Sequence, residues 1–311
     1  MTRLALGLLW LLHWLPLRVL GALGAGLGWL LYWLVPARRH IVRVNLGLCF
    51  PQLSAREKSA LARRHFIAIG RYIVELGVWW WASAERIQRL VKVDHGERLE
   101  AYRGRPVIIF APHFVGLDAG GIRLSIDYDI VSMYTRAKNK AFDEALRQGR
   151  LRFGRTKLVA RHEGVKKVLR PLKEGRLFYY LPDMDYGASD AVFVPFFGIP
   201  AATITGLARL SKLTGAPVIP VITRRCGDHY VASVGEPWAD YPSDDPLADA
   251  RRMNAYLEEE ILKSPEQYYW LHRRFKTRPP GAPRFYPRRR KRRAANAVVS
   301  SHSRDESTAD Q

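Results

Sequence analysis

The first 35 residues of the chain are almost entirely apolar. Within residues 4–35 the hydrophobic run is interrupted by His13 and Arg18, and residues 19–35 carry no charge. Seventeen residues rise about 25 Å as an α-helix, near the lower limit for crossing a bilayer. The pattern predicts an N-terminal membrane helix within residues 1–36. The alternatives are a helix pair lying in the membrane interface and a cleaved signal peptide, although the run is long for the latter.

Basic residues around this segment predict its orientation. Arg3 precedes the apolar run, whereas Arg38, Arg39 and Arg43 follow it. Because Lys and Arg accumulate on the cytoplasmic side of membrane segments, we expect the chain after residue 36 to face the cytoplasm from a single N-terminal anchor. Within the run, glycines 24 and 28 have the spacing of a helix-packing face, a spacing that also arises by chance.

Residues 54–92 have apolar positions at helical spacing. Ser54 and Glu57 form a capping-box pattern at the start of this segment. The run Trp79-Trp80-Trp81 near its end is either an exposed, membrane-facing aromatic cluster or ordinary core. We expect residues 37–104 to form a helical segment that packs on the domain that follows.

From about residue 105, short apolar runs alternate with amphipathic stretches, which is typical of an α/β domain. The predicted strands are 107–111, 130–134, 176–181, 218–223 and 230–234. The predicted helices are 117–126, 140–153, 164–173, 204–214 and 246–263. We therefore expect an α/β domain over residues 105–280, with a mixed sheet flanked by helices.

The charge balance points to an anionic partner. The formal net charge is +21 and the isoelectric point is about 10.3, which suits nucleic acid, anionic lipid or an acidic protein. The run RRRKRR at 288–293 lies in a tail, 281–311, whose composition predicts disorder. No nucleic-acid recognition motif accompanies that run, and we expect no nucleic acid partner. The two cysteines form neither a zinc pattern nor a disulfide framework.

The stretch APHFVGLDAG at 111–120 is the first candidate for chemistry. Positions five apart on one helix point about 140° apart, so His113 and Asp118 can meet only if His113 lies on a turn and Asp118 in the first turn of a helix. A strand ending at 111, then Pro112 and Gly116, provides such a break. The alternative is that Asp118 caps the helix and His113 is a loop residue.

A carboxylate on one imidazole nitrogen leaves the other nitrogen free to accept a proton. The chain has no Gly-x-Ser-x-Gly elbow and no cysteine near residue 113. The nucleophile would therefore be a substrate hydroxyl or water rather than a side chain. We expect no metal, because no second histidine stands at ligand spacing nearby.

This arrangement resembles the His-x-x-x-x-Asp/Glu acyltransferase superfamily, and more closely the late acyltransferases of lipid A biosynthesis. The resemblance runs from the N-terminal segment to Pro279. Its markers are APHFVGLDAG together with RVNLGLCFPQLS (43–54), HFIAIGR (65–71), YTRAKNKAFDEALRQGR (134–150), LPDMDYG (181–187), VFVPFFG (192–198), TGLARLSKLTGAPVIPV (205–221) and PEQYYWLHRRFKTRP (265–279).

The resemblance implies a glycerolipid-acyltransferase-like fold in the bacterial inner membrane. It implies acyl transfer from acyl carrier protein to a hydroxyl of a Kdo-bearing lipid A precursor, without a cofactor, next to membrane lipids. His113 would be the general base and Asp118 its orienting partner. Most characterised late acyltransferases carry Glu at the position of Asp118, whereas the glycerolipid acyltransferases carry Asp there, as this chain does.

Four further residues match the family and are implied to bind substrate. These residues are Arg136, Asp183, Asp185 and Arg209. Surface ion pairs are the alternative for the two arginines, and turn formation for the two aspartates. The segment VFVPFFG is either a wall of an acyl-chain groove or a core strand.

Two other functions remain open at this stage. The first is acyl transfer to another glycolipid or lysophospholipid. The second is a non-catalytic, basic, membrane-tethered binding protein, in which the pair formed by His113 and Asp118 would be dispensable.

Overall fold

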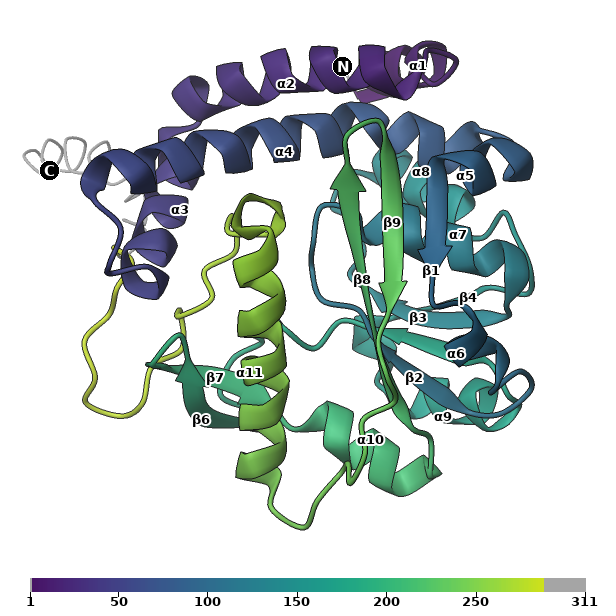
Figure 1. The fold of residues 1–311 in the computed structure, drawn as a ribbon, viewed down its shortest axis with the longest axis vertical. Helices are drawn as coiled ribbons and strands as arrows, with labels where there is room; N and C mark the ends of the chain where they lie inside the picture. The colour runs from purple at the N-terminus through teal and green to yellow at the C-terminus, as the bar shows by residue number, and fades with distance from the viewer. Residues whose placement is uncertain (1, 288–311) are drawn as a thin grey trace, which may run out of the picture.

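A seven-stranded mixed sheet forms the centre of the computed structural model, which describes residues 2–287 (Figure 1). Its strands lie in the order β1-β9-β8-β2-β5-β3-β4. Their bounds are β1 (Val91–Asp94), β2 (Val107–Phe110), β3 (Ile130–Tyr134), β4 (Lys157–Ala160), β5 (Leu177–Tyr180), β8 (Val218–Cys226) and β9 (His229–Val234). A separate hairpin joins β6 (Ala191–Phe196) to β7 (Ile199–Ile204).

The five strands from β8 to β4 run parallel, whereas β9 pairs antiparallel with β8 and β1 lies parallel to β9. All four residues of β2 are buried, as expected for a parallel strand covered on both faces. The predicted α/β class with a mixed sheet is confirmed. The five predicted strands correspond to β2, β3, β5, β8 and β9, and the sequence analysis missed β1, β4 and the hairpin.

Helices flank the sheet on both faces (Figure 1). The five predicted helices of the α/β domain are all present, within a few residues of their predicted ends. The helices beyond residue 35 are α3 (Pro36–Cys49), α4 (Ala55–Trp81), α5 (Ala84–Leu90), α6 (Glu97–Glu100), α7 (Leu117–Asp127), α8 (Lys140–Arg150), α9 (Lys166–Lys173), α10 (Gly206–Thr214) and α11 (Pro246–Lys263), with the short 3₁₀ turns η1 (Arg161–Glu163) and η2 (Pro265–Gln267).

The helix predicted over 54–92 ends earlier and is followed by a second helix and a strand. The capping box at its start is confirmed, because the Ser54 side chain accepts from the Glu57 backbone and the Glu57 side chain accepts from the Ser54 backbone. At its end Trp79 and Trp80 are only 1% exposed. Those two rings are core rather than membrane-facing, and Trp79 packs edge-on against Tyr230 of β9.

The apolar N-terminus forms α1 (Thr2–Leu12) and α2 (Leu17–Leu34), and α2 lies along α4 (Figure 1). Their backbones approach closely at three glycines. A Cβ atom built on Gly70 would lie 2.2 Å from the Gly24 carbonyl oxygen and 2.3 Å from the Gly28 nitrogen. Glycines 24 and 28 therefore do form a helix-packing face, and its partner is Gly70.

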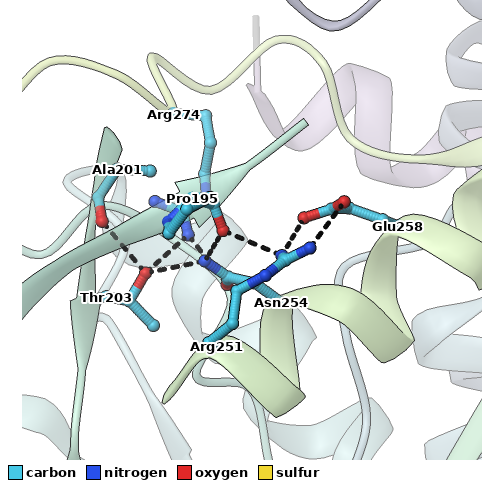
Figure 2. Close-up of polar contacts among 7 residues, drawn as sticks. All are labelled: Pro195, Ala201, Thr203, Arg251, Asn254, Glu258 and Arg274. Carbon is cyan, nitrogen blue, oxygen red and sulfur yellow. Dashed lines mark hydrogen bonds and ion pairs between the residues drawn. The ribbon is translucent and has the colours of Figure 1, made fainter. Parts of the chain in front are cut away.

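The segment after η2 is fastened to the hairpin and to α11 by Arg274, which is 2% exposed. Its guanidinium donates to the Ala202 carbonyl (2.8 Å) and to the Thr203 hydroxyl (3.2 Å). Asn254 of α11 donates to the same hydroxyl (3.1 Å) and to the Pro195 carbonyl (3.0 Å). Figure 2 shows the contacts of Arg274 and Asn254 with Thr203 and Pro195, which help to hold the C-terminal segment against the domain.

The three-glycine contact predicts a difference between two identical substitutions. Gly70→Ala forces α2 away from α4, and we expect a loss of about 1–3 kcal/mol in the free energy of unfolding. Gly26→Ala is the matched control, because its Cβ atom meets nothing within 4 Å and alanine favours a helix by about 1 kcal/mol over glycine. Denaturant unfolding of the two purified variants measures the difference. Equal stability of the two variants would contradict the close packing.

Candidate active site

His113 lies just beyond the carboxyl end of β2, and Asp183 lies just beyond that of β5. Because β2 and β5 are parallel neighbours, their two ends meet at the same edge of the sheet. The His113 Nδ1 atom is 2.7 Å from Asp183 Oδ1, and the His113 backbone N–H donates to Asp183 Oδ2 at 3.0 Å. One carboxylate therefore holds both the ring and the backbone of the histidine.

The electrostatics of this pair favour an ionised carboxylate. Asp183 is fully buried, and burial alone would raise the pKa of its carboxyl group. The charge of the His113 imidazole and the hydrogen bonds that Asp183 accepts outweigh burial and lower that pKa below its usual value. A ring nitrogen that faces an ionised carboxylate carries the proton, so Nδ1 donates and Nε2 is the basic nitrogen. Among residues 2–287 Nε2 has no hydrogen-bond partner.

The sequence predicts Asp118 as the orienting partner of His113, but in the structure the carboxylate hydrogen-bonded to the imidazole is that of Asp183. Asp118 lies in the first turn of α7, and its carboxylate accepts from Arg150 of α8 (2.6 and 2.7 Å) and from the Tyr72 hydroxyl of α4 (2.9 Å). A permanently charged guanidinium is a stronger partner for a buried carboxylate than an imidazole is. The carboxylate on the imidazole is that of Asp183.

Asp118, Arg150 and Tyr72 form a buried polar cluster. Asp118 is 4% exposed, and burial and the negative charge of Asp118 raise the pKa of the Tyr72 hydroxyl well above its usual value, which keeps it a donor. Burial lowers the pKa of Arg150, but the charge of Asp118, the hydrogen bond to Asp118 and the nearby Tyr72 and Tyr179 together outweigh burial and raise it. Arg150 is therefore a fixed cation.

His113, Arg150 and Tyr72 all line one groove of about 1190 Å³. Residues of α4 and α8 line one end of the groove, and residues of α9 and α10 line the other. Apolar side chains line most of the space between these ends, among them Leu117, Met133 and Leu169. The groove is thus a largely apolar channel with a basic nitrogen and a cation in its wall.

The other predicted site residues are distributed differently. Arg209 lines the groove and is 3.1 Å from Asp190. Arg136 is exposed and does not line the groove, although its neighbour Thr135 does. Asp183 is the partner of His113, as described above.

Asp185 is buried and faces away from the groove. Its carboxylate accepts from the Thr277 backbone (2.6 Å) and hydroxyl (2.8 Å), and its backbone N–H donates to His272 Nε2 at 3.0 Å. Burial lowers the pKa of His272 to about 4, so this ring is a neutral acceptor. Asp185 therefore fastens the C-terminal segment beside the site.

The segment VFVPFFG does not line the groove. Val194 and Phe196 of β6 are buried in the core, so the prediction of an acyl-chain wall there is wrong and the alternative of a core strand holds. The groove wall comes instead from α9, α10 and the ends of the central strands.

Arg150 and Tyr72 were not predicted as site residues. Arg150 is the last residue of the block 134–150 that carries the family resemblance, and its place in that block was the available signal. Within residues 2–287 no group of three or more His, Cys, Asp or Glu side chains is arranged to hold a metal ion.

Comparison with known proteins identifies the family of this chain. Residues 1–277 match the family model described as bacterial lipid A biosynthesis acyltransferase. The chain is 36% identical over 292 residues to the lipid A biosynthesis lauroyltransferase of Escherichia coli, covering 92% of this chain and 94% of that one. It is 33% identical over 291 residues to the palmitoleoyltransferase of the same bacterium, with the same two coverages.

A third relative, the Escherichia coli lipid A biosynthesis myristoyltransferase, is 32% identical over 79% of this chain and 77% of its own. The match to the family model extends over the apolar N-terminal helices, the residues that line the groove and the C-terminal segment as far as residue 277. It also includes His113, Asp118, Arg150 and Asp183. The chain is an acyltransferase and belongs to the bacterial lipid A biosynthesis acyltransferase family.

Proposed function

We propose that this enzyme transfers a fatty acyl chain from acyl carrier protein to a hydroxyl of a Kdo-bearing lipid A precursor. The observation that carries the proposal is the imidazole of His113, whose Nδ1 is held by a buried carboxylate and whose ring faces a largely apolar groove. Such an arrangement suits removal of a proton from a hydroxyl beside an acyl chain. The net charge of +21 suits both a phosphorylated lipid and an acidic carrier.

In the proposed reaction His113 Nε2 accepts the proton of the acceptor hydroxyl as its oxygen attacks the thioester carbonyl carbon. The carbon–sulfur bond then breaks, and the departing thiolate takes the proton from the imidazolium. Asp183 stabilises the imidazolium between these two steps without accepting its proton. The ester product and the free thiol balance the atoms of the two substrates.

Arg150 has a separate role in this proposal. Asp118 holds the buried Arg150 guanidinium in the groove wall. There the guanidinium stabilises the negative charge that develops on the thioester carbonyl oxygen. Asp118 is then a positioning residue that acts through Arg150. In this account His113 is the general base, and Arg209 contributes a further cation for substrate at the far end of the groove.

The general base is tested with His113→Ala. We expect the rate of acyl transfer to fall by about 10²–10⁴-fold, because no other base replaces Nε2. The measurement is lipid A mass spectrometry of cells that lack the protein, complemented by the unaltered chain or by the variant. Addition of one acyl unit by the unaltered chain but not by the variant is the expected result.

Two outcomes of that experiment would count against the proposal. Full acylation by the His113→Ala protein would show that His113 is not the general base. Unchanged lipid A in every strain, with acylation of another glycolipid or a lysophospholipid instead, would replace the acceptor.

Asp183→Asn and Asp118→Asn distinguish the two acids. Asp183 is ionised at every pH of assay because its pKa is lowered, so the acid limb of the pH profile of kcat/KM reports protonation of the base. Loss of the Asp183 charge makes the imidazolium less stable, and we expect the acid limb to move to lower pH and kcat to fall about 10²–10⁴-fold. Asp118→Asn should lower kcat without moving the acid limb of the pH profile, because Asp118 is not the carboxylate that contacts the imidazole. The reverse pattern would assign Asp118 to the imidazole, as the sequence first predicted.

The N-terminal helices fit association with a membrane. One described helix, Leu17–Leu34, is long and apolar enough to cross one, by length and composition, and a third of it is buried in the protein. The outward faces of α1 and α2, and the link between them, expose large apolar side chains. These are Leu4, Leu8, Trp10, Leu11, Trp14, Val19, Leu23, Trp29, Leu30, Trp33 and Leu34.

The contacts of these helices argue for lying in the interface rather than crossing. The Thr2 hydroxyl accepts from Asn139 at 2.9 Å, and Arg86 donates to the His13 and Leu15 carbonyls at 2.6 Å. Arg71 donates to the Gly21 carbonyl, in α2, at 3.2 Å. The start of α1, the link between the two helices and the N-terminal part of α2 are therefore hydrogen-bonded to the rest of the protein. Two of these contacts are made by guanidinium groups, which are costly within hydrocarbon.

In our proposal α1 and α2 lie in the cytoplasmic face of the inner membrane, and the α/β domain faces the cytoplasm. This replaces the predicted crossing helix with the interfacial pair that was its alternative. The test is Thr2→Cys in a Cys226→Ser background, treated in intact cells with a membrane-impermeant maleimide that reaches the periplasm. We expect no labelling until the inner membrane is opened, whereas labelling of intact cells would show that the helix crosses.

A further inference from the structure

A group of basic side chains surrounds the end of the groove formed by η1, α9 and α10. We call it the cationic surface, and all its members are exposed. It consists of Arg161, Lys166, Lys167, Arg170, Lys173, Arg209 and Lys212. Four of them, Arg161, Lys166, Arg209 and Lys212, also line the groove, so the surface and the site are continuous.

The charge of this surface is only partly compensated. Residues 161–173 contain five basic residues and one acidic one, Glu163. Arg170 pairs with Glu174, Arg209 with Asp190 and Lys212 with Asp244, all through exposed side chains. Such pairs are weak and exchange readily for other partners.

Three lysines of the surface have no carboxylate partner in the part of the chain that the structure describes. Within residues 2–287 no carboxylate lies within 4.0 Å of Lys166, Lys167 or Lys173. A patch of this kind attracts an acidic macromolecule and raises its rate of association.

An apolar path leads from the cationic surface into the groove. Leu213 of α10 is 61% exposed beside these cations, and it lines the groove together with Val165, Leu169 and Leu210. An exposed leucine among cations suits a protein partner that has acidic residues around a small apolar contact. The path also suits an acyl chain that passes from that partner towards His113.

The position of the surface distinguishes a soluble partner from a lipid. The apolar faces of α1 and α2 form the upper edge of the molecule, whereas α9 and α10 lie in its lower part, along the longest axis (Figure 1). A membrane that contacts α1 and α2 leaves the cationic surface in water, beyond the reach of headgroups in that membrane. The end of the groove formed by α4 and α8 is the one near the membrane.

We propose that the cationic surface is the docking site of the acidic carrier protein that presents the acyl thioester. The carrier docks on α9 and α10, its acyl chain enters through the apolar path, and the lipid acceptor approaches from the end formed by α4. The inference rests on the proposed acyl donor. It adds the surface on which that donor binds, and it explains how donor and acceptor can enter the groove from different ends.

The test uses two donors with the same acyl chain, one on acyl carrier protein and one as a pantetheine thioester. The variant is Lys167→Glu/Lys173→Glu, because these two lysines are exposed and neither lines the groove. We expect kcat/KM for the carrier-borne donor to fall roughly tenfold or more at low salt, and the difference to shrink as salt screens the charges. The pantetheine donor should react at the unaltered rate, which also shows that the variant is folded.

The matched control is Lys92→Glu/Lys157→Glu, the same double change at two exposed lysines that do not line the groove. It should leave both donors unaffected. An unchanged reaction of the carrier-borne donor with Lys167→Glu/Lys173→Glu would overturn the docking site. An equal loss with both donors and a raised KM for the lipid would assign the surface to anionic headgroups instead. If the unaltered enzyme uses the pantetheine thioester but not the carrier protein, it is the proposed donor that fails.

Discussion

The site depends on a carboxylate buried where two parallel strands end side by side. The Ala111 N–H donates to the Tyr180 carbonyl at 2.9 Å, so the chains leaving β2 and β5 remain in register for one more residue. His113 and Asp183 then face each other at 2.7 Å. A fully buried carboxylate is tolerated only with such compensation, and the same contact selects the nitrogen of the imidazole that faces the groove.

Helix α4 connects this site to the membrane-facing part of the molecule. Gly70 gives α2 its close contact with α4, and Tyr72, two residues later, donates to Asp118. Asp118 in turn holds Arg150 in the groove wall. Protein interiors are close-packed and transmit displacement. A shift of α2 along α4 is therefore passed to Arg150 through two contacts, Tyr72 with Asp118 and Asp118 with Arg150. The position of the lipid-facing helices and the geometry of the groove are therefore parts of one rigid arrangement.

The uneven distribution of charge and apolar surface gives the groove two different ends. Large apolar side chains are exposed on α1 and α2, and cations whose charge is only partly compensated gather on α9 and α10. A reaction that joins a membrane lipid to a chain delivered from water needs both kinds of surface on one enzyme, with the base between them. This arrangement gives a physical reason for the high net charge that does not require a nucleic acid partner.

The sequence by itself determined the fold class, the capped start of α4 and the position of His113 between a strand and a helix, because hydrophobic periodicity, capping and a strand–turn–helix break are local properties. It did not determine which carboxylate contacts the imidazole. Asp118 is five residues away and Asp183 is seventy, and only the order of strands, with β5 next to β2, decides between them. It likewise could not show that Trp79 and Trp80 are core, or that the apolar N-terminus packs along α4. Both features depend on residues distant in sequence that pack against these side chains, and only the folded chain brings those residues together.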